Sequence, residues 1–342
     1  MSVNKNTPPL IRLAHPLAFA AFLEHIGAPV DGYFRRQGLP YLLKDPNAYV
    51  PLSRAWGLFE DTVRREGEDL AWHVGQFTGD QNMSAGLLHK LRSAPTLYQA
   101  LQRIIRLINS EASHLHLGII EGRHQILFYS TGYYSHKDQP GFDCSQAYQL
   151  EVYIALTREF AGKRWQPQQM GICGSSVPDV VGQHFPDCRI QLEQPFSYFA
   201  IPRSCLHLPA RTKPAAAGDR APITLTEDLN YAETLALLIR PYLSQGYPSI
   251  RFAASLADTS ERTLSRRLSQ CGTNYQSLVD ELRFDLARNL LLESDALIRD
   301  ISAASGFSDQ ANFSRHFRRL SGISPRQFRQ QNGGGANASV SG

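Results

Sequence analysis

Two different periods of hydrophobic residues occur in the first two thirds of the chain. Apolar residues three or four positions apart predict amphipathic helices at His15–Ile26, Ser53–Arg65, Thr96–Asn109 and Ser145–Phe160. Alternation and short apolar runs predict strands at Leu115–Ile119, Gln125–Ser130, Gln169–Cys173, Arg189–Glu193 and Ser197–Ile201. A turn near Glu121-Gly122-Arg123 joins the first two strands into a β-hairpin. We therefore expect an α+β domain over residues 1–208.

The last third of the chain has helical periods only. We expect one helix from Thr226 to Gln245, ended by Gly246, and then a series of shorter helices. The stretch PARTKPAAAGDRAP at residues 209–222 is rich in Pro and Ala and has the composition of a linker. We therefore expect an all-α domain over residues 223–331, followed by a disordered tail at residues 332–342.

One five-residue pattern occurs twice in the helical region, as LSRRL (Leu264–Leu268) and as FSRHF (Phe313–Phe317). On a helix, the apolar residues at the two ends of each pattern form a buried face. The first copy exposes Arg262, Ser265, Arg266 and Ser269 on the opposite face. The second copy exposes Ala311, Ser314, Arg315 and Arg318. Each pattern therefore predicts a helix with a polar, cationic outer face.

Each of these helices follows a shorter apolar helix and a turn, which is the pattern of a helix-turn-helix. The two motifs span about residues 252–272 and 298–320, with Ser260 as a helix N-cap and Gly306 at a positive φ. A strongly periodic helix at Tyr275–Leu292 connects them. Its length of roughly 27 Å would place two recognition helices about one DNA turn, roughly 34 Å, apart.

The charge of this region favours a nucleic-acid partner. Residues 250–331 contain twelve Arg, no Lys, and nine Asp or Glu. Arg binds phosphates and base edges through two parallel hydrogen bonds, which Lys cannot do. A solvated Arg-rich surface is the alternative interpretation, but the duplicated motif with a connecting helix favours DNA binding.

The segment IRDISAASGFSDQANFSRHFRRLSGISPRQFR (Ile298–Arg329) and the segment Ser260–Leu268 resemble the AraC/XylS family of bacterial transcription regulators. Gly272 and Arg283 also fit the family pattern. Two positions depart from it: Ser302 replaces the usual Ala, and Ala311 is a short residue at an exposed reading position. We expect no loss of fold from Ser302, and at most a methyl contact to a base from Ala311.

The resemblance implies that two helices read DNA bases. The positions that match the family's reading residues are Arg262, Ser265 and Arg266 in the first helix and Gln310, Asn312 and Arg315 in the second. Arg pairs with guanine, and Gln or Asn pairs with adenine. We assign Arg318, Arg319 and Arg329 to phosphates, which position the protein without reading sequence. We therefore expect more base specificity from the first helix and more backbone contact from the second.

Three shorter segments connect the N-terminal region to one branch of this family. FLEHIGAPVD (Phe22–Asp31), YVPLSRAWGLFE (Tyr49–Glu60) and SAPTLYQAL (Ser93–Leu101) resemble its larger, arabinose-binding-domain-like effector-binding and dimerisation domain, which is distinct from the compact cupin-type sensor. The resemblance implies a homodimer, a small-molecule effector, and promoter DNA and RNA polymerase as partners. A ligand-independent regulator, controlled by abundance or a protein partner, is the alternative.

An enzyme is the weaker hypothesis for the N-terminal region, because no G-x-S-x-G or P-loop text occurs, and no cofactor is expected. The pair His114 and His116 and the set Cys173, His184 and Cys188 match no standard zinc spacing. The aromatic side chains that could line an apolar pocket, with core packing favoured, are Tyr129, Tyr133, Tyr134, Phe142 and Tyr148.

The remaining features of the sequence concern the compartment. The chain has five cysteines without a C-x-x-C pair, no apolar run near 20 residues, and no secretory signal in MSVNKNTPPL. These features predict reduced thiols and a cytoplasmic, nucleoid-associated protein without a membrane partner.

Overall fold

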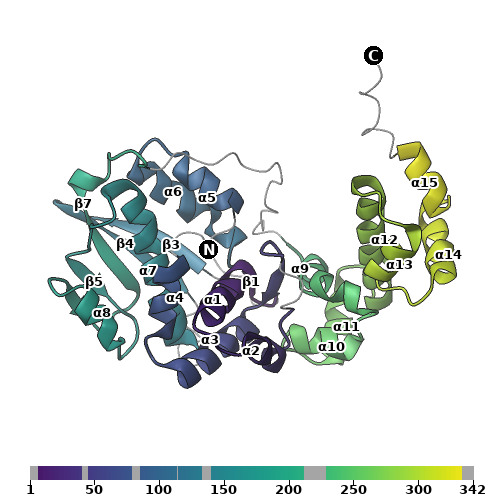
Figure 1. The fold of residues 1–342 in the computed structure, drawn as a ribbon, viewed down its shortest axis with the longest axis horizontal. Coiled ribbons are helices and arrows are strands. Elements are labelled where there is room, and N and C mark those ends of the chain that lie inside the picture. The colour runs from purple at the N-terminus through teal and green to yellow at the C-terminus, as the bar shows by residue number, and fades with distance from the viewer. Residues whose placement is uncertain are drawn as a thin grey trace, which may run out of the picture. The chain divides into compact units, whose positions relative to one another are not determined.

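The computed structural model describes residues 7–40, 45–78, 85–113, 115–132, 140–211 and 229–332. They form two compact units, an N-terminal unit and a C-terminal unit that begins at Leu229 (Figure 1). The predicted linker lies outside the described residues from residue 212 on, and so does the predicted tail from residue 333 on.

The N-terminal unit is an α+β fold, which confirms the expected fold class. Its first half pairs two short antiparallel strands, β1 (Leu10–Arg12) and β2 (Tyr49–Pro51), and is otherwise helical. Its helices are α1 (Ala14–His25), α2 (Val30–Gln37), α3 (Leu52–Glu66), α4 (Leu70–Thr78), α5 (Ala85–Arg92) and α6 (Leu97–Leu107), which the 3-10 turn η3 (Ile108–Ser110) follows.

A five-stranded sheet with the order β3-β4-β7-β5-β6 forms the second half of this unit. The predicted hairpin is present, with β3 antiparallel to β4 and Glu121 opposite Ile126. Among the described strands of this sheet, only β5 and β6 are parallel neighbours. The strands are β3 (Leu115–Glu121), β4 (Gln125–Gly132), β5 (Gln169–Gly171), β6 (Arg189–Gln191) and β7 (Ser197–Pro202).

Helix α7 (Phe142–Ala161) is the central helix of the unit and contacts α3, α4, α6 and β7. Its predicted inward residues Tyr148, Val152, Leu156 and Phe160 are buried. The buried set also includes Glu151, which accepts a hydrogen bond from Arg158 Nη1 at 2.8 Å. Burial on several sides explains why α7 shows a weaker amphipathic period than α6.

Several elements of the N-terminal unit were not predicted from the hydrophobic pattern. These are β1, β2, α2, α4, α5, α8 (Asp179–His184) and the 3-10 turn η5 (Arg203–Cys205). The two strands are only three residues long, and α4 is apolar around most of its circumference, so neither type of segment shows a clear period. Tertiary contacts decide the structure of such segments.

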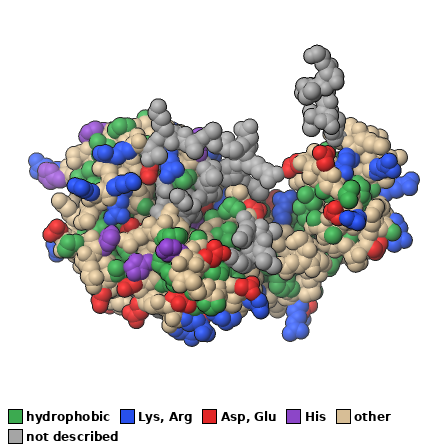
Figure 2. Space-filling view, viewed as in Figure 1, with side chains coloured by type: hydrophobic (Ala, Val, Ile, Leu, Met, Phe, Trp, Pro, Cys, Tyr) green, Lys and Arg blue, Asp and Glu red, His purple; other side chains and the backbone are tan. Residues whose placement is uncertain are grey.

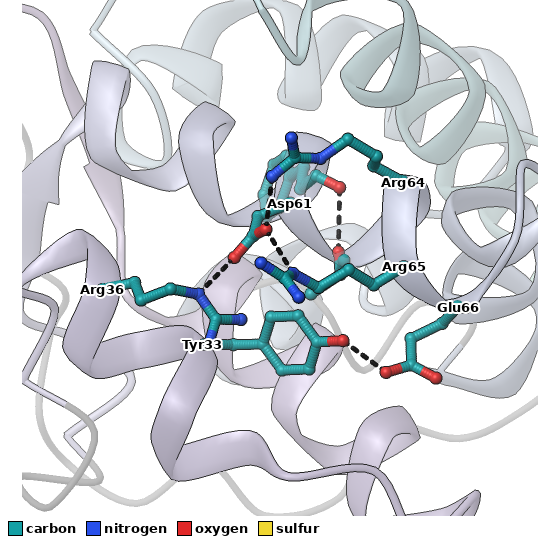
Figure 3. Close-up of polar contacts among 8 residues, drawn as sticks. Tyr33, Arg36, Asp61, Arg64, Arg65 and Glu66 are labelled. Atoms are coloured by element: carbon teal, nitrogen blue, oxygen red, sulfur yellow. Dashed lines mark hydrogen bonds and ion pairs between the residues drawn. The ribbon is translucent and has the colours of Figure 1, made fainter.

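A buried carboxylate ties α2 to α3 (Figure 3). Asp61 accepts from Arg36 Nε at 2.7 Å, Arg65 Nε at 2.8 Å and Arg64 Nη2 at 3.0 Å. Burial by itself raises the pKa of Asp61, but the three hydrogen bonds outweigh it and lower that pKa to about 2. The carboxylate is therefore ionised at neutral pH, and the two helices are held together through it.

The C-terminal unit is entirely helical over its described residues. The helix expected from Thr226 instead begins as α9 (Tyr231–Ile239), because Asn230 and Glu233 form a capping box at its N-terminus. Thr226 itself lies outside the described residues. The elements that follow are η6 (Arg240–Gln245), α10 (Ile250–Leu256), α11 (Glu261–Gln270), α12 (Tyr275–Glu293), α13 (Ile298–Ala304), α14 (Gln310–Ser321) and α15 (Pro325–Asn332).

Two separate hydrophobic cores lie within this unit. Leu278 and Val279 of α12 pack into the first core, with side chains of α9, α10 and α11. Ala287 and Leu291, near the other end of α12, pack into the second core with side chains of α13 and α14. The helix-turn-helix pairs α10–α11 and α13–α14 are thus joined by one long helix, as expected.

Candidate nucleic-acid interface and ligand cavity

Helix α11 presents the polar face predicted from LSRRL. The hydroxyl of Ser260 accepts a hydrogen bond from the amide of Thr263 at 3.2 Å and caps the helix. Leu264 and Leu268 are fully buried in the first core. The exposed residues of the helix include Arg262, Ser265, Arg266 and Ser269. Their polar groups are therefore available to a partner.

Helix α14 repeats this arrangement with different chemistry. The carboxylate of Asp309 accepts a hydrogen bond from the amide of Asn312 at 2.7 Å, whereas Ser260 caps the first copy. Phe313 and Phe317 are buried in the second core. The exposed face includes Gln310, Ala311, Asn312, Arg315 and Arg318. All six predicted base-reading residues are thus exposed on α11 and α14.

The three arginines assigned to phosphates differ in their surroundings. Arg318 is exposed and makes no ion pair with a described residue. Arg319 Nη2 lies 3.0 Å from Oδ2 of Asp280 on α12, although 62% of the Arg319 side chain is exposed. Arg329 is half-buried, and its Nη2 donates to the carbonyl of Ala296 at 2.7 Å. The structure therefore leaves Arg318 the most accessible, while Arg319 and Arg329 also bind their own chain.

One arginine of the C-terminal unit has a structural role that sequence reasoning did not assign. Arg283 on α12 is 7% exposed, and its Nε donates to the carbonyl of Ser305 at 2.9 Å. Its position four residues after Val279 and four before Ala287 puts it on a buried helix face. A charged residue on an apolar stripe is the signal that could have identified it. Other Arg side chains of this unit, whose described residues include no Lys, are visible at its surface in Figure 2.

A cavity lies inside the N-terminal unit, against α1, α3 and α7. Its lining residues are Ile11, His15, Trp56, Phe59, Ile108, Glu111, Ala112, Leu115, Ser145, Tyr148, Gln149, Val152 and Tyr153. Most of the surface is apolar, with a few polar groups, which is the usual make-up of a small-molecule site. Its volume of about 30 Å³ has room for only about one water molecule. No Lys or Arg belongs to this lining.

The polar groups at the cavity form a buried network. His15 Nδ1 and the hydroxyl of Tyr148 are 2.9 Å apart, and His15 Nε2 lies 3.7 Å from Glu111 Oε2. Behind them, Arg12 Nε lies 3.7 Å from Glu111 Oε1 and donates to the carbonyl of Ser110 at 2.8 Å. Burial and the nearby Arg12 lower the pKa of His15 to about 4. His15 is therefore neutral at pH 7.

Of the predicted pocket aromatics that the structure describes, only Tyr148 lines this cavity. Phe142 packs edge-on against Trp56 at 5.9 Å, and Tyr129 packs against Phe196 at 5.0 Å between ring centroids. Tyr133 and Tyr134 lie outside the described residues. His15 and Glu111 were missed, although charged residues next to apolar segments such as LIRLAH are a usable signal.

The candidate metal ligands do not form a cluster where they are described. Within the described ranges, no group of three or more His, Cys, Asp or Glu is placed to hold a metal ion. His114 lies outside those ranges, and His184 Nε2 is 2.8 Å from Nε2 of Gln76. Burial raises the pKa of the Cys188 thiol to about 11, so it is protonated at neutral pH. The helices of the described part also include none long and apolar enough to cross a membrane.

Known families match both units. The family described as the arabinose-binding domain of AraC transcription regulators matches residues 27–210, and a helix-turn-helix domain family matches residues 253–331. The ornithine utilization regulator of Pseudomonas aeruginosa is 32% identical over 146 residues, which are 41% of this chain and 43% of that protein.

A second relative matches almost the whole chain. The regulator VirS of Mycobacterium tuberculosis is 25% identical over 341 residues, which are 95% of this chain and 97% of that protein. Among solved structures, the transcriptional regulator CdpR from Pseudomonas aeruginosa aligns with 88% of this chain and 96% of its own at 20% identity, with a TM-score of 0.37. The first family match alone spans more than half of the chain, so this protein belongs to the AraC family of DNA-binding transcription regulators.

Proposed function

We propose that this regulator binds promoter DNA by inserting α11 and α14 into successive major grooves. The observation that carries the proposal is the pair of capped helices that each bury two apolar residues and expose polar reading residues. Helix α12 has 19 residues, or about 28 Å at the usual rise per residue. That length suits two grooves on one side of the duplex, about 34 Å apart.

Base reading is proposed for Arg262, Ser265 and Arg266 of α11 and for Gln310, Asn312 and Arg315 of α14. We assign backbone contacts to Arg318, to the exposed part of Arg319, and to those N–H groups of Arg329 that do not bind Ala296. Arg can bind guanine through two hydrogen bonds, whereas Gln and Asn match adenine. The first helix, with two arginines, therefore carries more of the base specificity.

The test uses single substitutions in the full chain on a DNA site found by mapping bound sites across the genome. Arg266→Ala and Arg315→Ala should each weaken binding to that site by about 1–3 kcal/mol, measured by fluorescence anisotropy and footprinting. Arg123→Ala removes an exposed charge from the hairpin turn of the N-terminal unit and serves as the control. Unchanged footprints for both recognition-helix variants would rule out reading by two helices.

The N-terminal domain, residues 1–208, is proposed to bind a small effector in the cavity beside His15 and Glu111 and to form the homodimer. RNA polymerase is the proposed partner at the promoter. What supports the effector is the lining of this cavity, apolar with a few convergent polar groups. At about 30 Å³ the cavity must widen to admit an effector. The first probes are amino acids, sugars and fatty acids; one relative is named an ornithine utilization regulator, and ornithine is an amino acid.

A thermal-shift screen with these three classes tests the effector. A binding compound raises the unfolding temperature of the chain by mass action. The substitution Ala112→Leu adds volume to the cavity wall and should abolish that shift. A shift that persists unchanged in Ala112→Leu would place the ligand elsewhere, and no shift with any class would favour a ligand-independent regulator.

A further inference from the structure

The two helix-turn-helix turns differ in a way that their shared pattern does not explain. In each turn the C-cap residue, Ala257 or Ser305, is followed by a residue at positive φ, which is Asp258 (φ 45°) in the first copy and Gly306 (φ 77°) in the second. The next amide, of Thr259 or Phe307, returns to a helix carbonyl at 3.0 Å in both copies. The first turn thus tolerates a side chain where the second has none.

Packing against the first motif explains the glycine. A Cβ on Gly306 would lie 2.3 Å from the carbonyl oxygen of Leu243 and 3.1 Å from that of Gly246. Leu243 belongs to η6 and to the first hydrophobic core of the C-terminal unit. That core and the helices around it are the first half of this unit. The second turn therefore rests directly on the backbone of the first half, at a distance that only glycine permits.

Arg283 stabilises the same contact by binding the backbone of the second turn. Besides its bond to Ser305, its Nη2 donates to the carbonyl of Gly306. The guanidinium carbon lies 3.5 Å from the ring centroid of Phe307 and 5.5 Å from that of Tyr247, which follows Gly246. One buried side chain thus links α12, the second turn and the segment after η6.

Beside this contact the two halves are separated. An open cleft of about 500 Å³ is lined by Ser244, Gln245, Gly246, Tyr247, Arg283, Ala303, Gly306, Phe307, Ser308 and Asn312. The two hydrophobic cores are distinct clusters, so apolar burial does little to resist bending between them. The contacts of Arg283 and Gly306, together with helix α12, are therefore the main restraint on the angle between the two helix-turn-helix motifs.

We propose that Arg283 and Gly306 form a joint that fixes the relative orientation of α11 and α14 and makes the protein selective for one spacing between its two DNA half-sites. The inference rests on the proposed reading of DNA by both helices. Arg283 and Gly306 are positioning residues, because they act through the turn and need no contact with DNA.

The test measures spacing selectivity of the full chain. Selection from random DNA first defines the two half-sites, and duplexes are then made with the spacing shortened or lengthened by one and two base pairs. Each base pair changes the separation by about 3.4 Å and the facing angle by about 35°. Affinity for each duplex is compared at a temperature at which circular dichroism shows every variant folded.

The wild-type chain is expected to lose at least about tenfold in affinity when the spacing changes by one base pair, because the half-site is then shifted by about 3.4 Å and rotated by about 35° relative to its helix. Arg283→Met keeps a side chain of similar length but removes the charge and the stacking. The affinity that this variant loses when the spacing changes by one base pair should be about threefold or less. Arg288→Met on the same helix removes an exposed arginine paired with Asp285 and should behave like the wild type.

Gly306→Ala provides a second test, because the added Cβ displaces the turn from Leu243. This substitution leaves the residues of α11 unchanged and should lower the same spacing selectivity. Arg283→Lys replaces Arg283→Met if the latter does not fold. Unchanged selectivity in the folded Arg283 and Gly306 variants would overturn the joint. A wild-type chain that shows no spacing preference would instead contradict reading by two helices, so the two failures are distinguishable.

Discussion

Arg266 and Arg315 occupy equivalent positions on α11 and α14, and both are exposed next to a buried apolar pair. Arg318 lies one turn further along α14 and makes no ion pair with a described residue. The same residue type thus has two expected roles on these helices. A base contact depends on the identity of one base pair, whereas a phosphate contact depends on salt.

Arg318→Ala should weaken binding to all DNA sequences by a similar factor and should reduce the slope of log affinity against log salt by about one. The physical reason is the loss of one released counterion per phosphate contact. Titrations at several salt concentrations, on a specific and a random duplex, measure both effects. A loss confined to the specific duplex would instead make Arg318 a base-reading residue.

His15 should make the stability of the N-terminal unit depend on pH. Its pKa is about 4 in the folded chain and near 6.5 when unfolded, so the unfolded state binds the extra proton between these values. Stability contributed by neutral His15 is complete above pH 6.5 and is lost as pH falls, by about 2 kcal/mol between pH 7 and pH 5. Urea unfolding of the wild type and His15→Gln measures this, and equal pH slopes would contradict it.

At the scale of elements, helix contacts in the N-terminal unit depend on one carboxylate. Asp61→Asn removes the charge that three arginines of α2 and α3 share, and should lower the free energy of unfolding by about 1–3 kcal/mol at pH 7. A lowered pKa means that this stability is present above about pH 4 and is lost as pH falls toward 2. The difference between wild type and variant should therefore shrink in acid, and a constant difference would contradict it.

Figure 2 shows cationic side chains gathered along the edge of the N-terminal unit that α2 and α3 form in Figure 1. The arginines around Asp61 belong to the same two helices, with Arg36 on α2 and Arg64 and Arg65 on α3. Their ion pairs show that a cluster of arginines can serve the fold itself.

The recognition helices depend on their caps. Asp309→Ala removes the acceptor for the amide of Asn312 and should cost about 1 kcal/mol in stability of the C-terminal unit. DNA affinity should fall too, because Gln310 and Asn312 lie in the first turn of α14. Asp309→Asn keeps a capping oxygen and should stay near the wild type in thermal unfolding. Equal losses in both variants would show that the charge, and not the cap, matters.

For the whole molecule, the C-terminal unit has its own two cores and its own capping interactions. A fragment of residues 222–331 should therefore fold and bind the specific duplex at low salt. Its affinity should be lower than that of the full chain if the N-terminal unit dimerises, since two linked sites bind with higher avidity. Absence of binding at low salt would show that the N-terminal unit contributes directly to the DNA contact.

Periodic elements were predictable from sequence because one face of each element is buried in the core and the opposite face is exposed to solvent. Helices α3 and α6, the hairpin β3–β4, and helices α11 and α14 all have one apolar and one polar side. The exposed reading face also followed from spacing alone, since residues three and four apart share a helix face. Local sequence was sufficient for these features.

Other features arise only when distant segments meet. The cavity combines residues of α1, α3, α7 and the segment after η3, and Arg12, Glu111 and His15 acquire their interactions there. Likewise, Gly306 is required by the Leu243 carbonyl, and Arg283 is buried by the second turn. The sequence by itself determined two helix-turn-helix motifs and their exposed polar faces, because these depend on local periodicity, and its resemblance to a known family indicated a regulator. The tertiary structure decided the cavity and the joint, because both depend on contacts between residues far apart in the chain.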